Sequence, residues 1–214
     1  MKKFFCLVSS IIIGAVAFAG EKYNVKAAVG FTLPVTVTNY DFETSSNLDI
    51  DQIGFGLDLS YLFFKKTNGL TFKLGISFDL INSEQMNEEF EGGGVKKGFC
   101  REYELNAGIG YSFIKTDRFT LTALAMLGLG STTYLYNYGS AELSIAHVYF
   151  DFGADLECFF QISNFLGVYG SVGIRYAKSI RGDYRAEIFG VSNTQSYSAN
   201  SLRIIPTFGI TLSY

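Results

Sequence analysis

Tryptophan is absent from this sequence of 214 residues, which contains one histidine, two prolines and three cysteines. A single histidine and no Cys-x-x-Cys pair provide no ligand spacing typical of a metal site, so we expect no metal and no other cofactor. Lys and Arg, 17 residues, are outnumbered by 20 Asp and Glu and form no basic cluster. This charge balance argues against binding of nucleic acid.

Long apolar runs are also absent after the first 20 residues. The chain begins MKKFFCLVSSIIIGAVAFAG, with two lysines, an apolar run at Leu7–Val16 and a small-x-small triplet at Ala17–Ala19. This order is typical of a secretory signal peptide, and the run is shorter than the roughly 20 residues of a membrane-spanning helix. We predict a signal peptide at residues 1–19 and one domain at residues 20–214, with a retained anchor as the alternative.

The abundant residues are 21 Phe, 14 Tyr and 23 Gly, a composition that suits strands better than helices. Apolar and polar residues alternate with period two in eight segments of 11 to 13 residues, and a tilted membrane strand needs about 9–11. The segments are residues 23–33, 53–63, 70–80, 103–113, 119–129, 148–160, 166–176 and 202–214.

The connections between these segments alternate in length. Long polar linkers at 34–52, 81–102, 130–147 and 177–201 alternate with short ones at 65–69, 115–118 and 161–165. Short periplasmic turns and longer external loops are typical of outer-membrane barrels. The sequence therefore predicts an all-β fold, an eight-stranded antiparallel up-and-down transmembrane β-barrel with both termini periplasmic.

Alternation alone does not separate a membrane barrel from a soluble one of lipocalin type, which would turn its apolar face inward. The apolar face here has 50 positions without a charged side chain, more bulk than an eight-stranded lumen accommodates. Twelve glycines fall on the polar face of the segments and only Gly170 on the apolar face. Glycine leaves room for longer side chains in a narrow bore, so we expect the apolar face to contact lipid.

The polar face then lines the lumen, where charged side chains need partners. By strand direction we expect Asp79 and Glu102 near the external rim and Glu157 near the periplasmic rim. Apolar lumen positions at Leu62, Leu124, Phe159 and Tyr169 fall in the periplasmic half, where they could plug the bore. We expect a lumen charge network of Lys26, Asp58, Lys73, Asp79, Glu104, Asp151, Asp155, Glu157, Arg175 and Arg203.

Pro206 falls inside the last segment, although proline cannot donate to a strand ladder and a closed barrel has no free edge. We expect a local bulge, or a late start of pairing, near this residue.

The chain ends TFGITLSY, in which Phe208, Ile210 and Leu212 alternate towards an aromatic last residue, Tyr214. With seven preceding segments, this ending resembles the assembly signal of the small eight-stranded outer-membrane barrels, the OmpA/OmpX/OmpW group, whose members more often end in Phe. The resemblance implies a location in the bacterial outer membrane. It also implies outer-membrane lipid and the barrel assembly machinery as partners.

Three functions remain open at this point. The first is a structural or surface-interaction role, with a largely closed lumen and external loops that could bind an extracellular ligand. The alternative is a porin-like narrow channel or transporter for small, mostly apolar solutes, as in the OmpW branch. The third, a lipid-modifying enzyme, is not expected. His147 is the only histidine, Ser144 is the serine nearest to it in sequence, and residue 149 is Tyr, so no His-x-Ser pair exists.

Basic residues in the predicted loops suggest one further contact. Lys96, Lys97, Arg181 and Arg185 could reach anionic lipid headgroups outside the membrane, although we expect them to be solvated loop charges.

Overall fold

The structure is a computed structural model that describes residues 23–42, 48–82, 99–138, 141–188 and 191–213. The predicted signal peptide and Tyr214 lie outside these ranges. No helix within them is long and apolar enough to cross a membrane. The strands that these ranges contain are β1 (Tyr23–Thr32), β2 (Val35–Phe42), β3 (Leu48–Lys65), β4 (Leu70–Asn82), β5 (Phe99–Lys115), β6 (Phe119–Tyr138), β7 (Ala141–Gln161), β8 (Leu166–Ile188) and β9 (Val191–Ser213).

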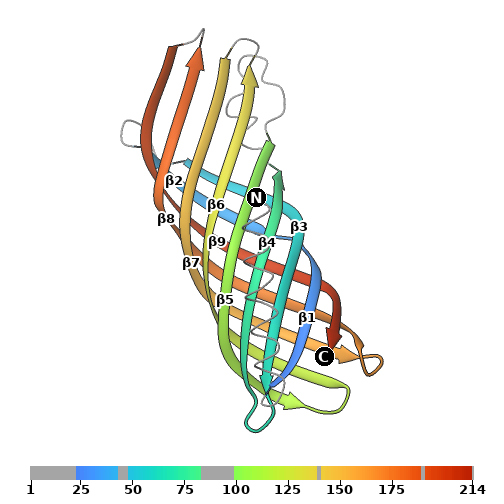
Figure 1. Ribbon diagram of the computed structural model, residues 1–214. Helices are drawn as coiled ribbons and strands as arrows, with labels where there is room; N and C mark the ends of the chain where they lie inside the picture. Colours follow the sequence, from blue (N-terminus) through green and yellow to red (C-terminus); the bar gives the residue numbers. More distant parts are fainter. Residues whose placement is uncertain (1–22, 43–47, 83–98, 139–140, 189–190, 214) are drawn as a thin grey trace, which may run out of the picture.

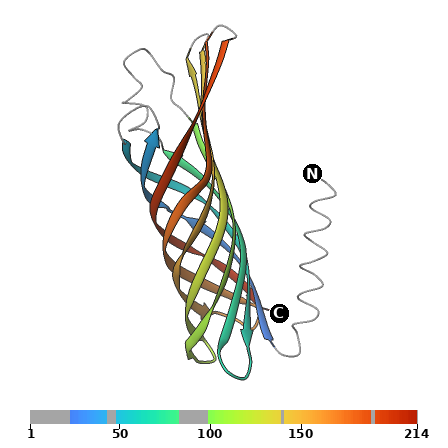
Figure 2. The same ribbon diagram turned by 90° about the vertical axis from the view of Figure 1, so that its left-hand side faces the viewer.

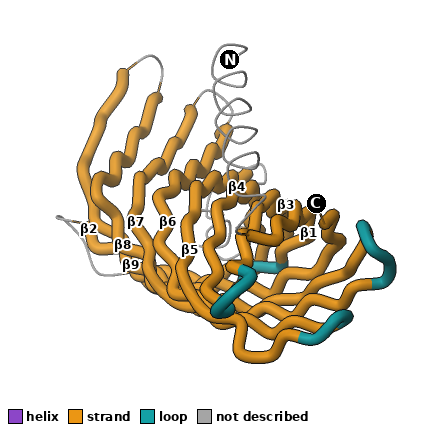
Figure 3. The backbone as a smooth tube through the Cα atoms, turned by 60° about the horizontal axis from the view of Figure 1, so that its bottom comes forward, coloured by secondary structure: helices purple, strands orange, loops and turns teal. Residues whose placement is uncertain are grey.

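The described strands form one closed ring of antiparallel pairs, tilted around a common axis (Figures 1 and 2). Successive strands pair from β3 to β9, and β1 closes the ring by pairing with both β3 and β9. β1 and β2 follow one another along the same gap between β3 and β9, so the nine strands occupy eight positions. The predicted eight-stranded up-and-down barrel is confirmed, with its short connections at one end (Figure 3).

Leu33 and Pro34 separate β1 from β2, yet the register against β9 is the same on both sides of the interruption. Pro206 of β9 lies beside it: the backbone N of Leu33 donates to the Pro206 carbonyl O at 2.9 Å, and proline has no N–H to return. β9 passes Pro206 without a register shift against β8, so the predicted bulge there is wrong. Proline at 206 therefore leaves no hydrogen bond of a continuous strand unmade, because β1 ends and β2 begins at this height.

The strands are longer than predicted at the external end. β6 to β9 contain 20 to 23 residues each and continue through most of the predicted loops 130–147 and 177–201. They rise beyond the ends of β2, β3 and β4 at the top of Figure 1. The short turns agree with prediction, and the one before β4 uses Gly69 at a φ of 71°, which L side chains rarely adopt.

The two faces of the barrel wall differ in exposure and in chemistry. Phe55, Leu105 and Phe152 point outward and are 62%, 53% and 51% exposed, whereas Asp151 and Glu157 point inward and are 0% exposed. An apolar surface that runs around the barrel far exceeds the patches found on soluble monomers. This apolar belt is the part of the wall that faces lipid.

Towards the external end the polarity of the two faces is reversed. Outward positions beyond the belt are polar, with Asp41 on β2 and Asp49 and Asp51 on β3 exposed. Inward positions at the same end are apolar or aromatic, such as Tyr40 and Ile145, both 0% exposed. Polar side chains on the outer face are compatible with contact to water, and apolar side chains on the inner face form a core. The strands therefore continue beyond the bilayer with the arrangement of a water-soluble β-barrel.

Candidate functional site: the barrel lumen

The periplasmic end of the lumen is filled by an aromatic cluster, formed by Ala28, Leu62, Phe64, Phe159 and Tyr169. The Phe159 ring lies 5.5 Å from Phe64, edge to face, and 5.8 Å from Tyr169, stacked. Of the four apolar lumen positions noted in the sequence, three meet here. Leu124 is buried as well, but lies outside this periplasmic cluster.

Lys26 belongs to this layer rather than to an ion pair. Its Nζ donates to Gln161 Oε1 at 2.9 Å and lies 5.3 Å from the centre of the Phe159 ring. The cation is therefore stabilised by an amide oxygen and by aromatic faces.

Lys73 begins the ionic layer, directly above the periplasmic cluster. Its Nζ lies 2.6 Å from Glu157 Oε1 and 3.6 Å from Asp155 Oδ2. Glu157 is 0% exposed, so its expected position near a wet periplasmic rim is wrong. The aromatic cluster separates this carboxylate from the periplasmic opening.

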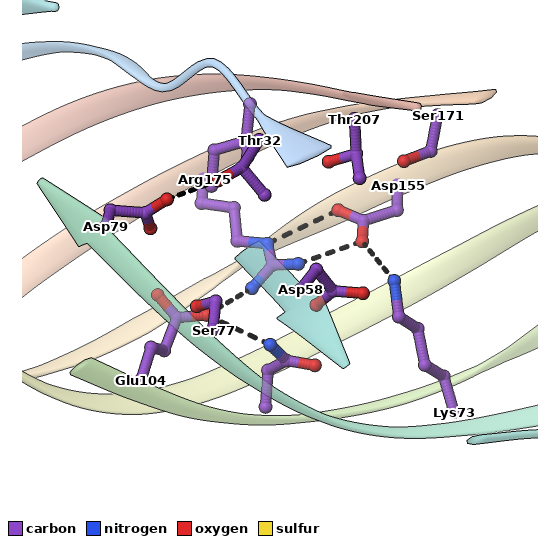
Figure 4. Close-up of a pocket in the computed structure, with 12 residues that line it drawn as sticks. Thr32, Asp58, Lys73, Ser77, Asp79, Glu104, Asp155, Ser171, Arg175 and Thr207 are labelled. Carbon is purple, nitrogen blue, oxygen red and sulfur yellow. Dashed lines mark hydrogen bonds and ion pairs between the residues drawn. The ribbon is translucent and has the colours of Figure 1, made fainter. Parts of the chain in front are cut away.

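Arg175 lies at the centre of the bore and bridges two strands (Figure 4). Its Nη2 donates to Asp155 Oδ2 at 2.8 Å, and its Nη1 donates to Glu104 Oε1 at 2.7 Å. Asp151 Oδ1 lies 3.8 Å from Nη1. A planar guanidinium with two carboxylates in this arrangement makes the strong, charge-assisted hydrogen bonds that buried ions require.

Arg203 extends the network towards the external end. Its Nη1 donates to Glu104 Oε2 at 2.6 Å and lies 3.4 Å from Asp151 Oδ2, while its Nη2 donates to Glu102. The Tyr149 ring packs 5.4 Å from the guanidinium carbon. Glu102, expected at the external rim, is instead a buried member of the network.

Asp58 and Asp79 lie beside these ion pairs and are bound by hydroxyl groups. Ser60 Oγ donates to Asp58 Oδ1 at 3.0 Å, and Thr32 Oγ1 donates to Asp79 Oδ1. The ten predicted network residues therefore fall into three environments: seven share a chain of ion pairs, two accept from hydroxyl groups, and Lys26 lies among aromatic rings.

Two glycines make room for the network carboxylates. A Cβ at Gly128 would lie 2.6 Å from Asp151 Oδ1, and one at Gly173 would lie 2.5 Å from Asp155 Oδ1. Both distances are shorter than van der Waals contact allows, so each carboxylate occupies the space that a larger residue would take.

A small cavity remains inside the ionic layer, lined by Asp58, Asp79, Arg175 and Thr207 among others (Figure 4). Its volume is about 20 Å³, room for about one water molecule. A second cavity, beside Arg203, has about 10 Å³. At neither place does the bore have room for an organic solute.

A second aromatic cluster, which we name the external cluster, closes the lumen above Arg203. Tyr40 and Tyr134 meet in it, their hydroxyl oxygens 3.3 Å apart. His147 Nδ1 lies 2.9 Å from the Tyr197 hydroxyl, in a layer that lies beyond the apolar belt. Burial raises the pKa of Tyr197, so this phenol stays neutral. The external cluster contains Tyr40, Ile50, Ile81, Cys100, Tyr134, Ile145, Tyr197 and Ala199.

Sequence reasoning missed the external cluster because its residues fall in segments interpreted as polar loops. The signal was present: Tyr40 and Ile50 continue a period-two pattern through residues 34–52, and Tyr197 and Ala199 continue one towards Arg203.

The predicted assembly signal lies on the outer wall at the periplasmic end of β9. Phe208, Ile210 and Leu212 are 54%, 49% and 39% exposed, and Tyr214 is outside the described residues. Their role in assembly stays a prediction. Within the described ranges, no group of His, Cys, Asp and Glu is arranged to hold a metal ion.

No protein-family model matches this sequence, and no curated protein does. A major outer membrane protein from Thermus thermophilus is similar in structure, with a TM-score of 0.63 and 12% identity over 87% of this chain and 99% of that one. The outer membrane protein OprG from Pseudomonas aeruginosa has a TM-score of 0.58 and 8% identity over 90% and 96%. The chain therefore has the fold of the bacterial outer-membrane β-barrels, with its apolar belt as the lipid-facing wall.

Proposed function

We propose that this outer-membrane β-barrel has a closed lumen and serves a structural or surface-interaction role at its external end. The observation that carries the proposal is the stacking of three layers in the bore: the periplasmic cluster, the ionic layer and the external cluster. The side chains of each layer are buried, and the larger cavity between the ion pairs has room for about one water molecule.

The external end supplies the surface for such a role. β6 to β9 extend beyond the belt as paired strands, with polar side chains such as Thr194 and Ser198 exposed on their outer face. A rigid strand platform presents loop residues to an extracellular ligand at lower entropic cost than free loops do.

The alternative is a narrow channel or transporter for small, mostly apolar solutes. It requires a continuous path past Arg175 and Arg203, whose guanidinium groups are each bound by two or more carboxylates. An apolar solute in this layer would have to separate these ions without replacing their hydrogen bonds, which is strongly unfavourable.

Conductance separates these two functions. Refolded protein in a planar lipid bilayer is expected to give no stepwise current, because ion pairs and aromatic rings fill the bore. Heat-modifiable gel mobility of the same sample establishes that folded barrel is present, so a silent bilayer is informative. Stepwise single-channel currents from the folded wild-type protein would overturn the closed lumen and favour the channel.

The proposal includes no catalytic activity. His147 points inward and contacts the Tyr197 phenol, whereas Ser144, an even-numbered neighbour on β7, belongs to the opposite face of the wall. A nucleophile and its base must lie within hydrogen-bond reach, which these two residues do not satisfy. Deacylase and acyltransferase assays on lipid extracts are expected to give the same result with His147→Ala as with the wild type.

We also propose that the barrel assembly machinery inserts this chain into the outer membrane through its last strand. The exposed apolar alternation of Phe208, Ile210 and Leu212 supports this partner. Outer-membrane lipid is the second proposed partner, through the apolar belt.

A further inference from the structure

An extra residue in β8 places two consecutive side chains on the outside of the barrel. Tyr149 pairs with Ser179 and Val148 with Arg181, which leaves Ile180 as the additional residue of a β-bulge. Ile180 is 66% exposed, and the neighbouring Arg181 side chain is 78% exposed. An apolar and a cationic group therefore lie side by side on the same outer surface.

Two more cations lie on the same strand. Lys178 precedes the bulge and Arg185 follows it, and both are exposed. Among the described side chains between Lys178 and Arg185, Asp183 is the acid, and its Oδ2 accepts from Arg181 Nε at 2.9 Å. We name Lys178, Ile180, Arg181 and Arg185 the β8 basic patch, whose net charge with Asp183 included is plus two.

The patch lies at the upper limit of the apolar belt. Lys178 is the next outward position after Tyr176 and pairs with Phe150 on β7 and Asn200 on β9. Alternate residues of a strand are about 6.6 Å apart, so Lys178 is one such step beyond Tyr176, the last aromatic residue on the outer face of β8. This is the depth at which the headgroups of the outer leaflet meet the barrel wall.

The charge of the outer wall at this depth is unequal around the ring. β2 and β3 present Asp41, Asp49 and Asp51, all exposed, on the external part of their outer face. A negatively charged headgroup is repelled there and attracted to β8. Within the described part of the wall, β8 has three outward cations at Lys178, Arg181 and Arg185, whereas β5 has the single exposed cation Arg101, so β8 has the largest cluster of positive charge at this end.

We propose that the β8 basic patch binds the phosphate group of an anionic lipid in the outer leaflet. Arg181 and Arg185 donate to phosphate oxygens, and Lys178 adds a point charge below them. Ile180 lies between Lys178 and Arg181 and adds an apolar contact beside the cations that hold the headgroup. This lipid site is independent of whether the lumen is closed, and it requires only that the barrel spans a membrane.

Lipid binding to the folded protein tests the proposal, with native mass spectrometry of refolded barrel in detergent titrated with phosphatidylglycerol or phosphatidylcholine. We expect the wild type to bind phosphatidylglycerol about tenfold or more tighter than phosphatidylcholine. The combined variant Lys178→Gln, Arg181→Gln and Arg185→Gln is expected to lose this preference. Raising ammonium acetate from about 0.1 to 1 M is expected to weaken the preference of the wild type, because salt screens exposed charges.

The matched control removes three positive charges from the other end of the barrel. Lys66, Lys115 and Arg118 lie in or beside the short turns and are exposed. Replacing these three with Gln is expected to leave the lipid preference unchanged. Equal loss in both combined variants, or no loss in the β8 variant, overturns the proposal.

Two further measurements distinguish lipid binding from binding of a free anion and from loss of the fold. Inorganic phosphate at the lipid concentration is expected not to displace phosphatidylglycerol, and displacement would overturn the lipid assignment in favour of a free anion. Heat-modifiable mobility of each variant reports the folded barrel, so a failure of lipid binding is distinguished from a failure of the fold.

Discussion

Replacing Arg203 with methionine is expected to destabilise the folded barrel by about 3–5 kcal/mol, because the change leaves buried carboxylates without their cation. Glu102 and Glu104 each lose a direct partner, and Asp151 loses a neighbour at 3.4 Å. The chain has no tryptophan. Unfolding in guanidinium chloride is therefore followed by gel mobility and circular dichroism of protein refolded into phospholipid vesicles.

The control is the same substitution at an exposed ion pair. Arg181 contacts Asp183, but the two side chains are 78% and 38% exposed. In phosphatidylcholine vesicles, which offer the β8 basic patch no anionic lipid, Arg181→Met is expected to change the free energy of unfolding by about 0–1 kcal/mol. Adding Glu102→Gln and Glu104→Gln to Arg203→Met is expected to recover part of the loss. Equal effects at Arg203 and Arg181 would contradict a closed ionic layer.

Replacing Ile109 with arginine is expected to destabilise the membrane-inserted barrel by about 2–4 kcal/mol, the cost of a cation near the bilayer midplane. Ile109 is 52% exposed on the outer face of β5 and lies near the middle of the outward run from Tyr103 to Phe113. The measurement is the free energy of unfolding from vesicles, compared with wild type under the same denaturant series.

Phe113→Arg on the same strand is the matched control. Phe113 is 53% exposed, like Ile109, but lies at the periplasmic end of the belt beside the turn at 116–118. Its expected cost is about 0–1 kcal/mol, because arginine at that depth reaches water. If Ile109→Arg costs no more than Phe113→Arg, the outer face of the belt does not contact hydrocarbon.

The period-two pattern of the sequence was sufficient for the barrel and for most of its membrane wall. Phe150 and Phe152 are exposed while Asp151 and Asp155 are buried, because neighbouring residues in a strand point to opposite faces whatever the pairing. The loops were predicted less well. Most residues at 130–147 and 177–201 continue β6 to β9 instead of forming loops. Beyond the membrane a strand can place polar side chains outside and apolar side chains inside, so its pairing need not stop at the bilayer surface.

Local alternation therefore determined by itself which side chains face lipid and which face the bore. Only the tertiary structure decided which lumen groups meet. Lys73 of β4 binds Glu157 of β7, and Arg203 of β9 binds Glu102 of β5, across the lumen between strands that are not neighbours in the ring. Such contacts depend on closure, on the relative register of all the strands and on the tilt that sets the height of each residue. The sequence pattern of a single strand does not determine closure, relative register or tilt.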